Sequence, residues 1–203
     1  MPFSPAFRRV LLCAFPAVFL ATACFAAGPM ETVKDITDRT IAILSDDGLK
    51  APEKLEEKKE LLRKLADEFF DWEGMAQTAL SVHWRNRTPA ERKEFTDLFA
   101  RFLDRTYMDR IEDYSGEKIE YLGEEIDKEY PDEAVVRANG ITAKNTAIPV
   151  EYLMIELDGT WKVYDVLIEG VSLLRNYTSQ FNSIILRSSY EDLVKMLKER
   201  TES

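Results

Sequence analysis

The chain has 203 residues, 45% of them hydrophobic, which is enough to bury the core of one domain. Its 37 Asp and Glu outnumber its 27 Lys and Arg, and this acidic balance argues against nucleic acid as a partner. His83 is the single histidine and the two cysteines lie near the N-terminus, so a metal site of several His or Cys ligands is excluded. Glycine-rich fingerprints for phosphates or dinucleotides are also missing, and we expect no cofactor.

The N-terminus has the pattern of a secretory signal peptide. Arg8 and Arg9 precede an apolar run at 10–23, and Ala26 ends a small-residue cleavage site. We therefore expect residues 1–26 to be removed, which leaves one cysteine-free domain at 27–203 with a net charge near −12, from 25 basic and 37 acidic residues. The alternative is a lipidated Cys24, but the usual Leu three residues before such a cysteine is missing.

The first half of this domain has helical periodicity. Apolar stripes predict helices at 30–45 and 52–70, and Asp71 can cap a short third helix. Thr88, Pro89 and Glu91 form a strong helix start, and the helix that follows carries a wide aromatic stripe. A stripe of that width indicates a helix that packs against a large surface elsewhere in the domain.

From Gly116 the period changes to two, which is typical of strands. Segments 118–122, 134–141, 148–157 and 160–168 follow one another without helices between them, so we expect an antiparallel meander of four strands or slightly more. Asp158 and Gly159 form a favoured two-residue hairpin turn. A helix at 172–186 and a last helix capped by Ser188 and Glu191 complete an α+β domain.

The stretch 161–181 joins the sheet to the C-terminal helices. Alternation places Trp161, Val163 and Asp165 on one side of a strand with two largely apolar faces. The pattern breaks at Glu169–Gly170, and a helical stripe begins at Val171. A sheet with two apolar faces that continues into an amphipathic helix predicts a sheet packed against a helical layer. The space between the two layers is either solid core or a cavity.

Asp165 is the one carboxylate in an unexpected place, in the middle of an apolar strand. It is either a general base with a raised pKa or, as we prefer, an acceptor of hydrogen bonds that fixes the strand. His83, between Val82 and Trp84, is best interpreted as structural or at a rim.

Three blocks of sequence together resemble the MlaC family, the soluble periplasmic carriers of the maintenance-of-lipid-asymmetry pathway, also called the toluene-tolerance or ABC-transporter auxiliary family. They are FDWEGMA at 70–76 with His83 and Trp84 after it, TPAERKEF at 88–95 leading to Tyr107 and to residues 114–117, and WKVYDV at 161–166 with EGVSL at 169–173 and Gln180–Phe181. The resemblance spans most of the domain.

The resemblance implies a periplasmic monomer in which sheet and helices enclose an apolar pocket for phospholipid tails. It also implies lipid exchange with two partners, an outer-membrane lipoprotein–porin complex and an inner-membrane ABC transporter with an MCE-domain subunit. From the faces of the predicted elements, the candidate lipid-binding residues are Met75, Phe99, Leu103, Tyr107, Val150, Tyr152, Val166, Ile168, Val171, Leu174 and Tyr177.

Two other classes of function remain open at this point. One is an isomerase- or hydratase-like enzyme that uses Asp165 with a tyrosine in the same pocket. The other is a ligand-free periplasmic adaptor with a solid core.

Overall fold

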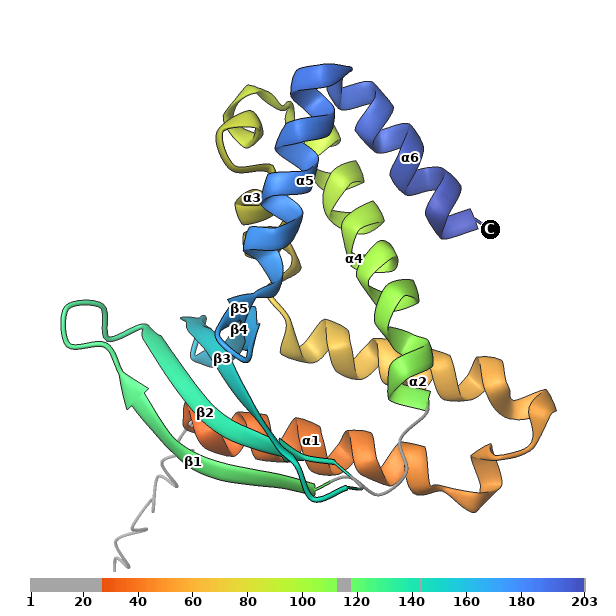
Figure 1. Cartoon of the computed structure of the whole chain (residues 1–203), viewed down its shortest axis with the longest axis vertical. Coiled ribbons are helices and arrows are strands. Elements are labelled where there is room, and N and C mark those ends of the chain that lie inside the picture. The colour runs from red at the N-terminus through yellow and green to blue at the C-terminus, as the bar shows by residue number, and fades with distance from the viewer. Residues whose placement is uncertain (1–26, 113–117, 143, 203) are drawn as a thin grey trace, which may run out of the picture.

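The chain folds into a helical part and a sheet part that lie against each other (Figure 1). The computed structural model describes residues 27–112, 118–142 and 144–202, so the predicted leader and residues 113–117 lie outside it. The helical part contains α3 (Trp72–Leu80), α4 (Pro89–Glu112), α5 (Leu173–Arg187) and α6 (Tyr190–Glu202). The sheet part contains α1 (Pro29–Ser45), α2 (Leu55–Phe69) and five strands. The predicted α+β fold is confirmed, and no helix in these described ranges is long and apolar enough to span a membrane.

The five strands form one antiparallel meander in sequence order. They are β1 (Lys118–Ile126), β2 (Glu133–Ile141), β3 (Ala147–Leu157), β4 (Thr160–Ile168) and the short β5 (Val171–Ser172). Asp158 and Gly159 both have positive φ, 51° and 77°, as the predicted hairpin turn requires. Short 3₁₀ turns at Asp47–Leu49, Pro52–Lys54 and Ser81–Asn86 connect the helices of the N-terminal half.

The predicted break at Glu169–Gly170 is a second two-residue turn. Both residues again have positive φ, 52° and 78°, and the chain folds back so that Ile168 pairs with Val171. This turn creates β5, which periodicity did not predict, and it delays the start of α5 to Leu173. Val171 is therefore a strand residue and not the first member of the helical stripe.

Side-chain caps explain where the helices begin. The Thr88 hydroxyl donates to Glu91 at 2.8 Å and accepts from the Glu91 amide at 3.3 Å, while Glu91 accepts from the Thr88 amide at 2.7 Å. This is the predicted capping box of α4. The cap of α6 lies one residue later than predicted. There the Ser189 hydroxyl accepts from the Asp192 amide at 3.0 Å, because α6 begins at Tyr190.

A bulge in β4 changes the face assignment made from the sequence. Met154 pairs with Val163 and Leu153 pairs with Asp165, so Tyr164 is an extra residue on β4. After Tyr164, each side chain of β4 therefore lies on the opposite face of the sheet from the one that simple alternation predicts. Val166 therefore shares the inner face with Val163, and the expectation that Asp165 shares this face was wrong.

The apolar side chains form two separate cores. One lies among α3, α4, α5 and α6, with Phe95, Phe99 and Phe181 in mutual ring contact at centroid distances of 5.5–5.9 Å. The other joins α1 and α2 to the inner face of the sheet through Val33, Phe69 and neighbouring strand residues. Phe70 packs against both cores, so it marks the boundary between them.

The capping box of α4 can be tested by removing the Thr88 hydroxyl. Thr88→Ala is expected to lower the free energy of unfolding by about 1 kcal/mol, because the Glu91 amide loses its partner. Urea unfolding measures the change. Thr88→Ser keeps the oxygen and should keep most of the stability; equal losses in both variants would contradict the capping role.

Candidate functional site

A cavity of about 860 Å³ lies along the boundary between the two cores. Its size falls in the range of about 300–1,000 Å³ that is usual for ligand pockets. The wall residues come from every helix except α6 and from the first four strands: Ile36, Thr37, Thr40, Ile41, Leu44, Leu62, Arg63, Leu65, Ala66, Asp67, Phe69, Phe70, Trp72, Met75, Thr96, Asp97, Ala100, Arg101, Leu103, Asp104, Tyr107, Lys118, Ile119, Gly140, Tyr152, Val166, Ile168 and Leu173. Most of these side chains are apolar, so the space suits a hydrocarbon ligand.

Helix α1 has an apolar stripe of which one part packs against the sheet and another part lines the cavity. Val33, near its N-terminus, is fully buried against the sheet. Ile36, Ile41 and Leu44 continue toward the C-terminus, yet they are only half-buried and line the cavity. A helix with an apolar stripe normally buries it against the core. Here the outer half of the stripe faces an open space.

Helix α2 and the following residues form a wall of side chains that includes aromatic rings. Phe69 and Phe70 meet edge to face at a centroid distance of 5.1 Å, and Phe70 meets Trp72 at 5.0 Å. The Trp72 indole N–H donates to Asp67 at 2.9 Å, which fixes the indole ring. These contacts give the cavity a rigid side where the two cores meet.

The sheet contributes Tyr152, Val166 and Ile168 to the opposite wall. Tyr152 and Val166 are partners across β3 and β4, and Val150 and Ile168 are partners two residues further along. Burial raises the pKa of Tyr152 to about 12, because the charged phenolate would lose its hydration there. Ile168 is 47% exposed and also lines the cavity, so the cavity opens toward solvent near the end of β4.

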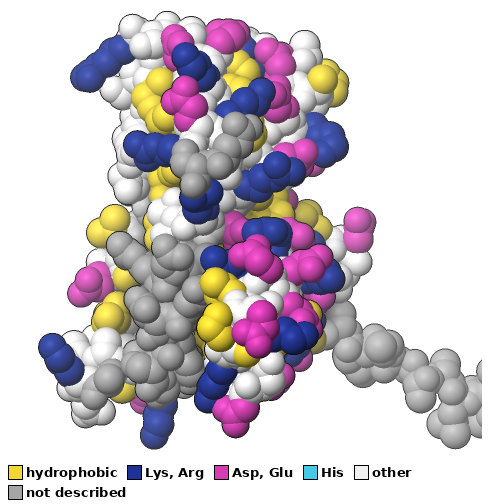
Figure 2. All heavy atoms as spheres, turned by 90° about the vertical axis from the view of Figure 1, so that its right-hand side faces the viewer, with side chains coloured by type: hydrophobic (Ala, Val, Ile, Leu, Met, Phe, Trp, Pro, Cys, Tyr) yellow, Lys and Arg dark blue, Asp and Glu magenta, His cyan; other side chains and the backbone are white. Residues whose placement is uncertain are grey.

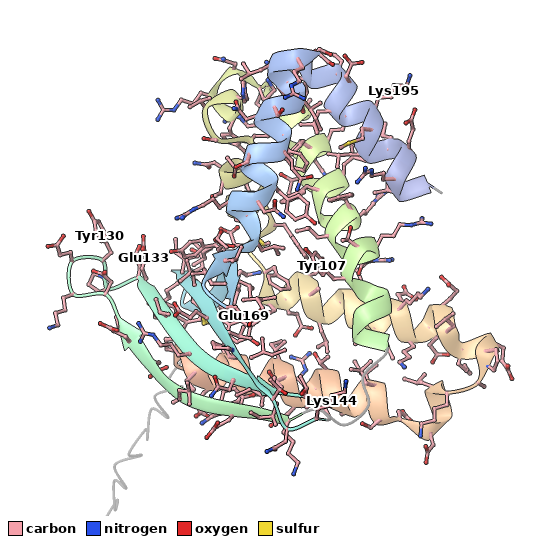
Figure 3. The ribbon with its side chains drawn as sticks, in the orientation of Figure 1. Tyr107, Tyr130, Glu133, Lys144, Glu169 and Lys195 are labelled. Carbon is pink, nitrogen blue, oxygen red and sulfur yellow. The ribbon has the colours of Figure 1, made fainter. Side chains whose placement is uncertain are left out.

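Helix α4 supplies Leu103 and Tyr107, which extend from the helical core to the cavity. Figure 3 places Tyr107 on the side of α4 that faces the sheet part. Its hydroxyl lies 3.3 Å from that of Tyr177, within hydrogen-bond distance. Burial, followed by this hydrogen bond, raises the pKa of Tyr177 above its ordinary value.

Charged residues are concentrated where α2 and α4 approach each other. Arg63 donates through Nε and Nη2 to one oxygen of Asp104, at 2.9 Å and 2.7 Å. Asp97 accepts from Lys93 at 2.7 Å. The side of the molecule that carries α2, α4 and α6 shows basic and acidic side chains interspersed (Figure 2). The cavity therefore has an apolar interior and a polar edge.

The structure places part of the predicted lipid-binding set on the cavity wall. Met75, Leu103, Tyr107, Tyr152, Val166 and Ile168 line it. Phe99, Leu174 and Tyr177 lie instead in the helical core, because their side of the helices packs against other helices. Val150 is half-buried on β3 and outside the wall, and Val171 is 68% exposed because the turn at 169–170 places it on β5.

Helices α1 and α2 are the part of the wall that sequence reasoning missed. Their apolar stripes were recognised, but stripes of this kind normally pack in a core, and nothing in their period distinguishes a core from a cavity.

Asp165 is a structural residue that holds the end of β4 to the start of α5. It is 7% exposed and accepts from the Val166 amide at 2.8 Å, the Ser172 hydroxyl at 2.5 Å and the Leu174 amide at 3.1 Å. It does not line the cavity. His83 also has a structural partner, with Nε2 at 2.9 Å from Asn182 Oδ1. No group of metal-ligating side chains occurs within the described residues.

A family model for the MlaC protein matches residues 34–199. The toluene tolerance protein Ttg2D of Pseudomonas putida is 24% identical over 192 residues, which cover 93% of this chain and 85% of that protein. The intermembrane phospholipid transport system binding protein MlaC of Haemophilus influenzae is 25% identical over 125 residues, which cover 59% of this chain and 57% of that protein.

A solved structure has the same fold as this chain. It is a phospholipid-binding protein from Ralstonia solanacearum in complex with a phospholipid. The TM-score is 0.76 at 26% identity, and the match covers 87% of this chain and 98% of that one. The similarity therefore includes both the sheet part and the helical part.

The structural role of Asp165 predicts a large loss of stability when its carboxylate is removed. Asp165→Ala is expected to lower the free energy of unfolding by about 3 kcal/mol, because two backbone amides and a hydroxyl lose a buried acceptor. Urea unfolding measures this, with Glu129→Ala on an exposed turn as the control. Asp165→Asn keeps one acceptor oxygen and should lose less; if Asp165→Ala is as stable as the control, the carboxylate does not join β4 to α5.

The raised pKa of Tyr152 predicts a decline of stability at high pH. Its folded-state pKa of about 12 lies above the ordinary value of 10.0, so the unfolded chain loses this proton first and stability falls as the pH rises from 10 to 12. Tyr152→Phe should make that decline shallower in unfolding experiments. Tyr130→Phe removes an exposed phenol and is expected to leave the decline in place; identical pH profiles for the wild type and Tyr152→Phe would contradict burial of the phenol.

Proposed function

The chain belongs to the MlaC family, and we propose that it is a non-enzymatic carrier that encloses the acyl tails of a phospholipid in its cavity. One observation carries the proposal: an apolar cavity of about 860 Å³ lies between two cores in a fold that matches a phospholipid-complexed protein over 87% of this chain. Two of the matched proteins are named for binding or transport of phospholipid.

The free energy of hydrating lipid tails explains why such a carrier is needed. Two tails contain about 30 methylenes, and at about 0.8 kcal/mol each their exposure to water costs about 24 kcal/mol. Free lipid is therefore a very poor intermediate between two membranes. A cavity with apolar walls removes this cost and requires no specific contact with each methylene.

We assign the tails to the wall residues on both sides of the boundary. The predicted residues among them are Met75, Leu103, Tyr107, Tyr152, Val166 and Ile168, and α1 and α2 add Ile36, Ile41, Leu44, Leu62, Leu65 and Phe69. Ile168 is both exposed and part of the wall, so the wall reaches the surface near the end of β4. Asp165 is engaged elsewhere, which argues against proton transfer to a ligand.

We propose that the protein functions in the periplasm, after removal of residues 1–26. The basic and apolar pattern of that segment supports export. As a monomer, the protein would exchange lipid with an outer-membrane lipoprotein–porin complex and with an inner-membrane ABC transporter that carries an MCE-domain subunit. Membership of the MlaC family supports this assignment of partners.

Filling the cavity with a large side chain tests the proposal. Val166→Trp is expected to reduce the phospholipid that co-purifies with the protein by about five-fold or more, because the indole takes space that the tails need. Native mass spectrometry and lipid extraction of the purified protein measure the load.

Val82→Trp is the matched control, since Val82 is 69% exposed on the 3₁₀ turn before α4 and does not line the cavity. It should carry the lipid load of the wild type. A folded Val166→Trp protein with an undiminished load would show that lipid binds elsewhere, and a wild type purified without phospholipid from a membrane-containing extract would favour the adaptor.

A further inference from the structure

The wall of the cavity has six charged residues in its described part: Arg63, Asp67, Asp97, Arg101, Asp104 and Lys118. Three of them, Asp97, Arg101 and Asp104, lie on α4, and Arg63 reaches Asp104 from α2; two of these four are carboxylates that already have a cation. Asp104 is bound by Arg63 and Asp97 is bound by Lys93. Asp104 is only 14% exposed, whereas its partner Arg63 is 53% exposed.

Arg101 lies between these two carboxylates on α4 and pairs with neither. It is one helical turn from Asp97 and from Asp104, where ion pairs commonly form. Among the described residues, no hydrogen bond, ion pair or ring contact engages its guanidinium. Lys93 and Arg63 already pair with the two neighbouring carboxylates, so Arg101 is a wall cation that has no ion-pair partner among the described residues.

We propose that Arg101 binds the phosphate of the phospholipid whose tails occupy the cavity, an inference that rests on the proposed function. A guanidinium offers parallel N–H donors that match two oxygens of a phosphate. A phosphodiester carries a single negative charge and would therefore be the anionic partner that Arg101 does not find within the protein. The tails then extend from α4 toward Val166 and Tyr152. Asp104, the carboxylate one turn after Arg101, is already bound by Arg63.

Lys118 is the other unpaired cation of the described wall, and its surroundings suit a phosphate less well. It lies on β1, and residues 118–172 hold twelve acidic and five basic residues. Residues 89–107 of α4 hold four of each. A phosphate at Lys118 would meet a strongly acidic sheet, and an ammonium cannot present the two fixed donors of a guanidinium.

The test compares two ligands with the same tails that differ in the phosphate. Dioleoylphosphatidylglycerol and dioleoylglycerol are titrated, at low and at moderate salt, against wild-type protein loaded with a fluorescent fatty acid. We expect the wild type to prefer the phospholipid by about five-fold, with a smaller preference at higher salt. Arg101→Ala should bind both ligands about equally, and Arg101→Lys should retain part of the preference.

Two control variants remove an unpaired cation elsewhere. Arg175→Ala changes an exposed residue of α5 outside the wall, and Lys118→Ala changes the other wall cation. Arg175→Ala should keep the wild-type preference in full, and Lys118→Ala separates the two wall cations, because its preference should exceed that of Arg101→Ala. Inorganic phosphate should compete weakly with the phospholipid and not with dioleoylglycerol.

Three results would overturn the inference. The first is an unchanged preference in Arg101→Ala, and the second is a loss of preference in Lys118→Ala alone. The third is binding of inorganic phosphate at Arg101 that leaves phospholipid binding undisturbed, which would assign the site to the free anion. Failure of the wild type to bind either lipid is a different outcome, because it contradicts the proposed function itself.

Discussion

The hydrogen bonds of Asp165 connect the two halves of this molecule, and the cavity depends on that connection. The carboxylate accepts from Ser172 and Leu174 and so fixes the first turn of α5 to the last residues of β4. Because α5 packs against α3 and α6, this short link positions the helical core relative to the sheet. Asp165, the unexpected carboxylate of an apolar strand, thus connects the two parts through hydrogen bonds. The cost of burying its charge is balanced by the donors that bind it.

The cavity follows from two cores that are each complete and yet remain separate. In the helical core, aromatic rings of α4 and α5 contact one another, so that side of α4 has no surface left for the sheet. In the other core, Val33 and Phe69 cover the middle of the sheet but not its end. Among the described residues, only Phe70 packs against both. The apolar side chains between the cores therefore face a space, which protein interiors rarely leave empty unless a ligand occupies it.

The elements of the fold could be predicted from the sequence because each is encoded locally. Thr88, Pro89 and Glu91 start α4 wherever the helix lies, and Asp158–Gly159 forces a hairpin. The face of Asp165 could not be predicted, because the extra residue Tyr164 in β4 depends on pairing with β3. The cavity was also beyond reach, since the stripes of α1 and α2 have the same period whether they pack in a core or line a space. The resemblance to a family supplied what periodicity could not.

The two parts of the proposed ligand would differ in what they contribute to binding. Burial of two tails amounts to about 24 kcal/mol, whereas a single exposed guanidinium–phosphate contact contributes about 1 kcal/mol or less. Affinity would therefore come from the apolar wall, which discriminates weakly among tails. Arg101 would instead decide which end of the lipid lies at the edge between α2 and α4. Such an orientation would leave the head group at the polar edge formed by α2 and α4 while the tails remain enclosed between the two cores.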